Sequence, residues 1–271
     1  MYNDLYIMEI QIKDSEIELE GGKAEAEVLT AEDKAKLPIL EEMMRAGLIY
    51  GRKKSKTSPK MKSFIFTFRN GVALFDLSRT LEQLEKAIEF LKGIIQKGGR
   101  ILIVGTQPAA RDLVKAFAEE LKQLYVNERW LGGMITNFKT IGARIEYFKK
   151  LKIDREAGRH DKYTKKEKLL LSREIDKLTM FFAGVEEMSQ LPAAMFIVDA
   201  VVHETALREA RKSKIPVVAL MNSDSDPELA QYPIPANSGA RPGIVWMLER
   251  LKQELKNVKM ESVKAEIPVV K

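Results

Sequence analysis

The 271-residue chain contains no cysteine and only two histidines, His160 and His203. The absence of cysteine excludes disulfides, zinc ribbons, iron–sulfur clusters and cysteine nucleophiles, and two histidines are too few for a multi-histidine metal site. Long apolar runs are also missing, because stretches such as 101–104 and 193–198 are far shorter than the roughly 20 residues that cross a bilayer. Residues 1–20 are acidic and lack an apolar core, so we expect no signal or transit peptide and a cytoplasmic protein.

The charge is ordinary in amount and uneven in placement. Apolar residues make up 45% and charged residues 31%, which is typical of a globular protein, and the net charge is +6. Residues 1–42 hold 12 acids and 4 bases, whereas the rest of the chain holds 41 bases and 27 acids. A basic body behind an acidic leader indicates a polyanionic partner, with a merely solvated surface as the alternative.

The central and C-terminal parts alternate between strand and helix patterns. Apolar runs predict strands at 101–104, 125–126, 193–198 and 216–220, and the first is apolar throughout, as expected when both faces are buried. Amphipathic segments predict helices from Pro108 to about Leu124, at 204–212 and at 244–256, and an extended segment at 232–235. This order predicts an α/β fold with a mostly parallel sheet flanked by helices.

A smaller unit precedes this sheet. A short helix is expected from Pro38 to Ala46, ending at Gly47, and residues 48–62 are expected to form a loop. Residues 63–68 alternate like a strand, Asn70-Gly71 is a strong hairpin signal, and 72–75 is the return strand. Thr80 with Gln83 matches a capping box that would open the next helix, which ends at Gly98-Gly99.

Two further amphipathic helices interrupt the strand–helix alternation. They are predicted at 139–152 and 164–182, and Thr164 with Glu167 forms a capping box for the second. Residues 139–179 hold 13 bases and 7 acids. Two such helices joined by a short link predict an antiparallel hairpin that zips by its apolar seams and projects from the globular body.

These patterns divide the chain into four parts. Residues 1–36 are expected to be an acidic, mobile extension, and 258–271 a C-terminal tail. Residues 37–138 and 184–257 would form the α/β globular domain, with the helical hairpin of 139–183 inserted between its halves.

Two segments carry chemistry suited to nucleic acid. Residues 45–69, with Arg45 and Arg69 included, hold eight Lys and Arg residues and no acid, and six of the eight lie in the segment 52–62. This pattern is typical of phosphate contacts. In the segment 127–140, Arg129 could fork onto a phosphate, Trp130 could stack on a base, Gly132-Gly133 permits close approach, and Asn137 could cap the following helix. The alternative for this second segment is a turn that plugs the hairpin base, with Trp130 in the core.

Signals for an enzyme are weaker. Asp199, Asp224 and Asp226 follow strand ends, where sheet proteins place active sites, and Asp224 with Asp226 could hold Mg²⁺. However, Asp226-Pro227 is typical of a turn, and dinucleotide, Walker and nucleophile-elbow motifs are missing. Both histidines are expected to be solvated. We therefore expect no catalytic, metal-binding or cofactor-binding residues, with a Mg²⁺-dependent phosphoryl-transfer enzyme as one alternative.

Many ordered motifs resemble a known family. Residues 129–133 (RWLGG) followed by 136–141 (TNFKTI) resemble the signature of the second protein of the small ribosomal subunit, in its bacterial and organellar form. Matching segments follow in the family's order over about 38–255: 59–61, 69–71, 76–77, 97–106, 191–192, 198–199, 209–210, 215–219, 226–227 and 232–235. The chain departs from the family pattern at Arg52 and Thr57, where a histidine and a tryptophan are usual, and in its acidic leader.

The resemblance implies a flavodoxin-like fold with a protruding coiled coil and a structural role without catalysis. It implies binding to small-subunit rRNA between head and body, contacts with neighbouring ribosomal proteins, and help in recruiting ribosomal protein S one. It also implies a protein that works without self-association and is located in the cytoplasm, bound to the ribosome. A paralogue of the ribosomal protein with a scaffold role is a further alternative. The residues expected to bind RNA are Arg52, Lys53, Lys54, Lys56, Lys60, Lys62, Arg69, Arg129, Trp130, Asn137, Lys139, Arg144, Lys165 and Lys166. The leader 1–36 is expected not to touch RNA, because phosphate would repel it.

Overall fold

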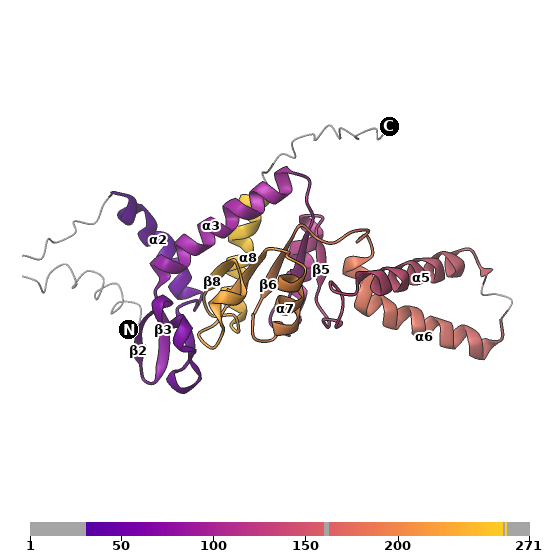
Figure 1. Cartoon of the computed structure of the whole chain (residues 1–271), viewed down its shortest axis with the longest axis horizontal. Helices are drawn as coiled ribbons and strands as arrows, with labels where there is room; N and C mark the ends of the chain where they lie inside the picture. Colours follow the sequence, from indigo (N-terminus) through magenta and orange to yellow (C-terminus); the bar gives the residue numbers. More distant parts are fainter. Residues whose placement is uncertain (1–30, 160–162, 257, 259–271) are drawn as a thin grey trace, which may run out of the picture.

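The computed structural model describes residues 31–159, 163–256 and 258, which fold into an α/β structure with two sheets (Figure 1). The predicted leader therefore falls mostly, and the predicted tail almost wholly, outside the described residues. A three-stranded antiparallel sheet lies at one end, a five-stranded parallel sheet lies in the centre, and two helices extend at the other end. The predicted fold class is confirmed.

The five-stranded sheet is parallel throughout. It contains β4 (Ile101–Val104), β5 (Leu124–Val126), β6 (Ala194–Val198), β7 (Val217–Met221) and β8 (Tyr232–Pro235), in the order β5-β4-β6-β7-β8. The chain thus starts inside the sheet, moves to one edge and then crosses back, which is the flavodoxin-like order with its topological switch between β4 and β6.

Alternate strand residues face two separate apolar layers. On β6, Phe196 faces one core cluster and its neighbours Met195 and Ile197 face the other, as the two-residue period of a strand requires. The first cluster is covered by helices α2 (Ala31–Arg45), α3 (Leu77–Gln96), α4 (Arg111–Glu120) and α8 (Arg241–Lys256). The second is covered by α7 (Glu204–Lys212), α5 (Phe138–Glu156) and α6 (Lys165–Phe182).

The three-stranded sheet is built from β1 (Tyr50–Lys53), β2 (Ile65–Arg69) and β3 (Val72–Phe75), in the order β1-β3-β2. The predicted Asn-Gly turn joins β2 and β3, with φ of 49° at Asn70 and 74° at Gly71, as a type I′ turn requires. Two short 3₁₀ helices, η2 (Lys54–Lys56) and η3 (Pro59–Phe64), connect β1 to β2. The expected loop at 48–62 is wrong in part, because its first residues pair with β3.

Four predicted helix starts are wrong, and one of them is that of α8, which begins at Arg241 instead of at 244. Helix α3 begins at Leu77, three residues before Thr80, because the Asp76 carboxylate accepts hydrogen bonds from the backbone of Ser78 and Arg79. The Thr80 hydroxyl instead lies 2.6 Å from the carbonyl oxygen of Pro235. Helix α2 begins at Ala31 and continues through Pro38, and α4 begins at Arg111 after a turn that follows Gln107.

Helices α5 (Phe138–Glu156) and α6 (Lys165–Phe182) pack against each other and extend away from the sheet (Figure 1). A short 3₁₀ helix, η5 (Ala183–Val185), follows α6. The apolar residues that α5 and α6 bury belong to one cluster: Ile145, Phe148, Leu151, Ile175 and Phe182. The capping box predicted for α6 is confirmed, since Thr164 and Glu167 exchange hydrogen bonds. The link between the helices falls outside the described residues at 160–162, and His160 with it.

Candidate nucleic-acid interface

The loop that leads into α5 wraps around the carboxylate of Glu209, a buried residue of α7. One carboxylate oxygen accepts hydrogen bonds from the Trp130 indole N–H (3.0 Å) and the Gly133 backbone N–H (2.9 Å). The other accepts from the Ile135 backbone (3.1 Å) and from both the backbone N–H and the hydroxyl of Thr136 (each 3.2 Å). A single acidic side chain thereby fixes seven consecutive residues, 130–136, which we call the Glu209 loop.

The ionised form of Glu209 is the one that this arrangement favours. Burial acts to raise the pKa of the carboxyl, but hydrogen bonds from Trp130 and from the backbone of Gly133, Thr136 and Ile135 outweigh it. The net result is a pKa below the ordinary value, because every contact is a donor and only the carboxylate can accept them all. The carboxylate therefore remains charged at neutral pH.

The predicted residues of this segment lie in different environments. Arg129 and Lys139 are exposed, whereas Trp130 is half-buried and packs against the second core cluster. Asn137 occupies the position before α5, but its side chain makes no capping bond to the backbone; its oxygen accepts from the Thr140 hydroxyl at 2.9 Å. The predicted capping role of Asn137 is therefore wrong.

The basic segment 52–62 displays several cations to solvent. Lys53, Lys56 and Lys62 are exposed, and the Lys54 ammonium lies 5.5 Å from the centre of the Phe68 ring, a cation–π arrangement. The segment holds no acid of its own, so its exposed lysines leave a locally positive surface. Arg69 is half-buried at the end of β2.

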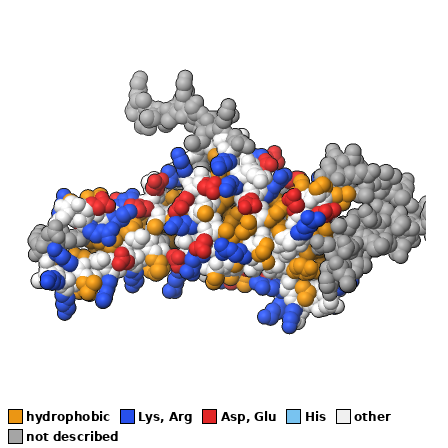
Figure 2. Space-filling view, turned by 180° about the vertical axis from the view of Figure 1, so that it is seen from behind, with side chains coloured by type: hydrophobic (Ala, Val, Ile, Leu, Met, Phe, Trp, Pro, Cys, Tyr) orange, Lys and Arg blue, Asp and Glu red, His pale blue; other side chains and the backbone are white. Residues whose placement is uncertain are grey.

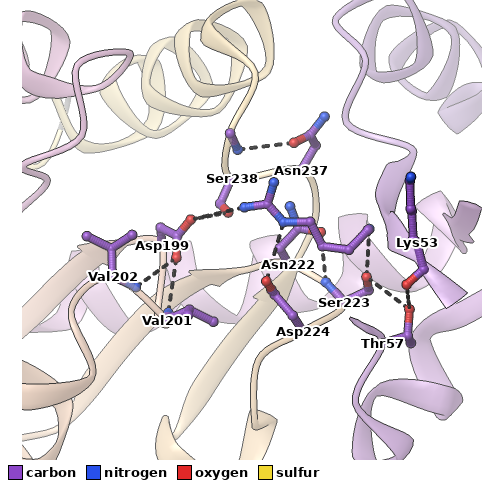
Figure 3. Close-up of polar contacts among 12 residues, drawn as sticks. Lys53, Thr57, Asp199, Val201, Val202, Asn222, Ser223, Asp224, Asn237 and Ser238 are labelled. Atoms are coloured by element: carbon purple, nitrogen blue, oxygen red, sulfur yellow. Dashed lines mark hydrogen bonds and ion pairs between the residues drawn. The ribbon is translucent and has the colours of Figure 1, made fainter. Parts of the chain in front are cut away.

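Arg52 differs from its neighbours because it faces acids of the parallel sheet. Its Nε lies 3.3 Å from Asp224, one Nη lies 4.0 Å from Asp199, and its backbone N–H donates to the Ser223 hydroxyl at 2.8 Å. Figure 3 shows Asp199 after β6, Ser223 and Asp224 after β7, and Ser238 after β8 meeting here, with Ser238 donating to Asp199 at 2.7 Å. Arg52 therefore joins the three-stranded sheet to the carboxyl ends of β6 and β7.

Lys60 makes a second link of the same kind. Its ammonium lies 2.8 Å from Asp226 and 2.7 Å from Glu228, at the 3₁₀ helix η6 (Pro227–Leu229). The hydrogen bonds to Asp226 and then Glu228 raise the pKa of Lys60, and Lys60 is the main cause of the lowered pKa of Asp226. Asp226 also accepts from the Glu228 backbone, so the predicted turn at Asp226-Pro227 is confirmed.

The expectation that His203 is solvated is wrong. Its side chain is buried at the switch between β4 and β6, where Nε2 lies 3.1 Å from the backbone nitrogen of Thr106 and Nδ1 lies 2.9 Å from the carbonyl oxygen of Asp199. The crevice that binds ligands in many doubly wound sheets therefore contains the protein's own His203. In the part of the chain that the structure describes, no three His, Asp or Glu side chains are placed to hold a metal ion.

The helix pair carries the remaining predicted residues. Lys165 and Lys166 are exposed in the first turn of α6, and the exposed Arg144 lies 5.7 Å from the centre of the Tyr147 ring. Figure 2 shows Lys and Arg side chains projecting along the lower margin, both at the end formed by α5 and α6 and at the end formed by the three-stranded sheet. The fold thus places the predicted cations at two distant positions.

The structure also reveals residues that the sequence patterns did not point to. Glu209 and Ser223 bind backbone groups far away in sequence, and neither stands in a local motif. One signal in the sequence was the match of Glu209-Ala210 to the family order, which gave no partner for the carboxylate. The charge of Glu209 inside an otherwise apolar helix face, beside Ala206 and Ala210, was a usable hint that it needed buried donors.

Fold and surface together define a flavodoxin-like α/β protein with an inserted helix pair and a strongly basic margin. The family model described as "Ribosomal protein S2" matches residues 43–257, and the chain belongs to this family. Among its relatives, the small ribosomal subunit protein uS2 of Coprothermobacter proteolyticus is 42% identical over 201 residues, covering 74% of this chain and 75% of that protein. The uS2 protein of Salinispora arenicola is 43% identical over 202 residues, covering 74% and 72%, and that of Nocardia farcinica is 41% identical over 201 residues, covering 74% and 70%.

No helix within the described ranges is long and apolar enough to cross a membrane.

Proposed function

We propose that this chain is a structural component of the small ribosomal subunit and binds small-subunit rRNA through phosphate contacts. The observation that carries the proposal is the family membership over residues 43–257, with relatives that are named small ribosomal subunit proteins. The same comparisons favour this role over the phosphoryl-transfer enzyme and the scaffold paralogue. The exposed cations supply a physical means of binding, because lysines that neutralise phosphates release counterions.

The predicted RNA-binding residues fall into two groups in this proposal. The exposed side chains contact phosphate directly: Lys53, Lys56, Lys62, Arg129, Lys139, Arg144, Lys165 and Lys166. The others act by holding these groups in place, since Arg52 and Lys60 are paired with acids and Trp130 is bonded to Glu209. Lys54, Arg69 and Asn137 border the direct contacts.

The partners follow from the same assignment. The protein would contact small-subunit rRNA and adjacent ribosomal proteins, with ribosomal protein S one among them, and would work in the cytoplasm as a single copy per subunit. Binding would depend on shape and backbone contacts more than on base sequence, as is usual for folded RNA.

Sedimentation of a native lysate tests the assignment. The lysate is separated on sucrose gradients at low and high Mg²⁺, and this chain is detected in each fraction. We expect it to sediment with free small subunits at low Mg²⁺ and with whole ribosomes at high Mg²⁺, at moderate salt. Recovery at the top of the gradient under both conditions would contradict the proposed function.

A further inference from the structure

Arg129 and Lys139 flank the Glu209 loop, and both are exposed. Neither has an ion-pair partner among the residues that the structure describes, whereas the adjacent Glu128 pairs with Arg111 at 3.0 Å. The position of these two cations depends on the path of residues 130–136. Five hydrogen bonds to Glu209, three of them from backbone N–H groups, help to hold that path. Buried Met134 and Ile135, and backbone hydrogen bonds from Met134 and Asn137 to earlier residues of the loop, hold it as well.

We propose that Glu209 is a positioning residue for RNA binding: it holds the Glu209 loop so that Arg129 and Lys139 reach phosphates together. The inference rests on the proposed function and goes beyond it by assigning a role to a buried acid that cannot itself meet RNA. Phosphate contacts require donors at a fixed spacing, and a loop without backbone-to-backbone strand pairing needs another means of fixing that spacing.

The geometry makes glutamine a sharp probe of this role. One oxygen of Glu209 accepts two donors and the other accepts three. In Glu209→Gln the side-chain NH₂ must replace one of these oxygens. In one orientation the NH₂ faces two N–H donors, and in the other it faces three N–H or O–H donors. The substitution keeps the size of the side chain and breaks the loop's anchoring, because two donors cannot bond to each other.

A matched control lies on the same helix. Glu204→Gln removes the same charge at an exposed position of α7, where Glu204 pairs with Arg208 one turn away. A charge effect on RNA binding would be common to both variants. Loss of the loop's position would occur in Glu209→Gln alone.

The test measures binding of the full chain to small subunits that lack it, as a function of salt. Log affinity falls as log salt rises, and we give the steepness of this fall as a positive slope. In the native background, Arg129→Ala with Lys139→Ala should lower this slope by about 1.5, at about 0.7–0.9 for each phosphate that is no longer neutralised. Glu209→Gln should lower the slope by the same amount, and adding the two Ala substitutions to it should change nothing more. Glu204→Gln should leave the slope unchanged.

A native slope in Glu209→Gln, or full additivity with the Ala pair, would overturn the inference and leave Glu209 with a purely structural role. If Glu209→Gln does not fold, Thr136→Val removes only the hydroxyl donor and should still lower the slope, and a native slope there would also overturn the inference. Failure of the unaltered chain to bind would overturn the proposed function and this inference together.

Discussion

At the residue scale, His203 is a neutral side chain whose tautomer is set by its neighbours. A carbonyl oxygen can only accept, so the 2.9 Å contact with Asp199 places the proton on Nδ1 and leaves Nε2 to accept from the Thr106 backbone. Protonation would direct a second ring N–H at the Thr106 N–H. Burial lowers the pKa of His203, and the contact with Asp199 offsets this only in part.

This environment predicts that acid destabilises the protein through His203. The native pKa lies below the ordinary 6.5, so the unfolded chain binds more protons as the pH falls through 6.5 towards the native pKa. The contribution of neutral His203 to the free energy of unfolding is fully present above pH 6.5 and is lost as the pH falls below 6.5. Over that range, the free energy of unfolding falls by at most about 1.4 kcal/mol per pH unit because of this residue. Urea unfolding between about pH 7.5 and about pH 5.5 measures the slope.

Removal of the His203 ring provides the comparison. His203→Gln removes the titrating group, so its free energy of unfolding should depend less on pH than that of the native chain. An equal dependence in His203→Gln and the native chain would contradict the argument.

At the element scale, local patterns predicted most of the secondary structure. Residues 72–75, 101–104 and 204–212 have the predicted bounds because apolar periodicity and turn residues mark both ends. The start of α3 was missed because Asp76 and Thr80 both suit a helix start, and only the contact of Thr80 with Pro235 shows which one is used. Strand β1 was missed because its basic residues give no apolar alternation. The strand forms because its backbone pairs with β3, and that pairing leaves no local pattern in the sequence.

The candidate site was predictable to the extent that it consists of exposed charge. Runs of lysine in the sequence become exposed lysines in the structure, since nothing in the core can accept them. The roles of Arg52 and His203 depend on which loops meet at the carboxyl ends of β4, β6 and β7, and that meeting depends on the strand order. The role of Glu209 depends on how the loop after β5 packs against α7. Sequence distance alone does not carry that information.

The pairing of α5 with α6 gives a prediction about an element. Phe148 is fully buried in the cluster that joins the two helices, whereas the next aromatic residue, Tyr147, is 37% exposed. Phe148→Ala should lower the free energy of unfolding by about 3–5 kcal/mol, because it leaves a cavity. Tyr147→Ala should cost less, about 1 kcal/mol, because its partly exposed ring leaves no buried cavity and the change removes one hydroxyl hydrogen bond to Glu174 of α6. Urea unfolding followed by circular dichroism measures both, and equal effects would contradict the packing described.

At the scale of the whole molecule, the fold pairs some cations of the segment 52–62 with acids of the protein and leaves others without such a partner among the described residues, although both kinds are exposed. Arg52 and Lys60 close the gap between the two sheets by pairing with acids of the parallel sheet. Lys53 and Lys56 follow in the same segment and remain exposed, with no ion-pair partner among the described residues. Neighbouring basic residues in the sequence therefore have different roles: Arg52 and Lys60 bind acids of the protein, whereas Lys53 and Lys56 are available to bind a polyanion.

This separation predicts that position, and not total charge, governs RNA binding. Lys53→Ala with Lys56→Ala should lower the salt slope of binding to small subunits by about 0.7–0.9 for each phosphate that the missing ammonium would have neutralised. Lys86→Ala with Lys97→Ala removes the same charge from exposed sites on and just after α3 and should leave the slope unchanged. An equal decrease in the two pairs would show that net charge alone drives association. An unchanged slope in the first pair would remove Lys53 and Lys56 from the interface.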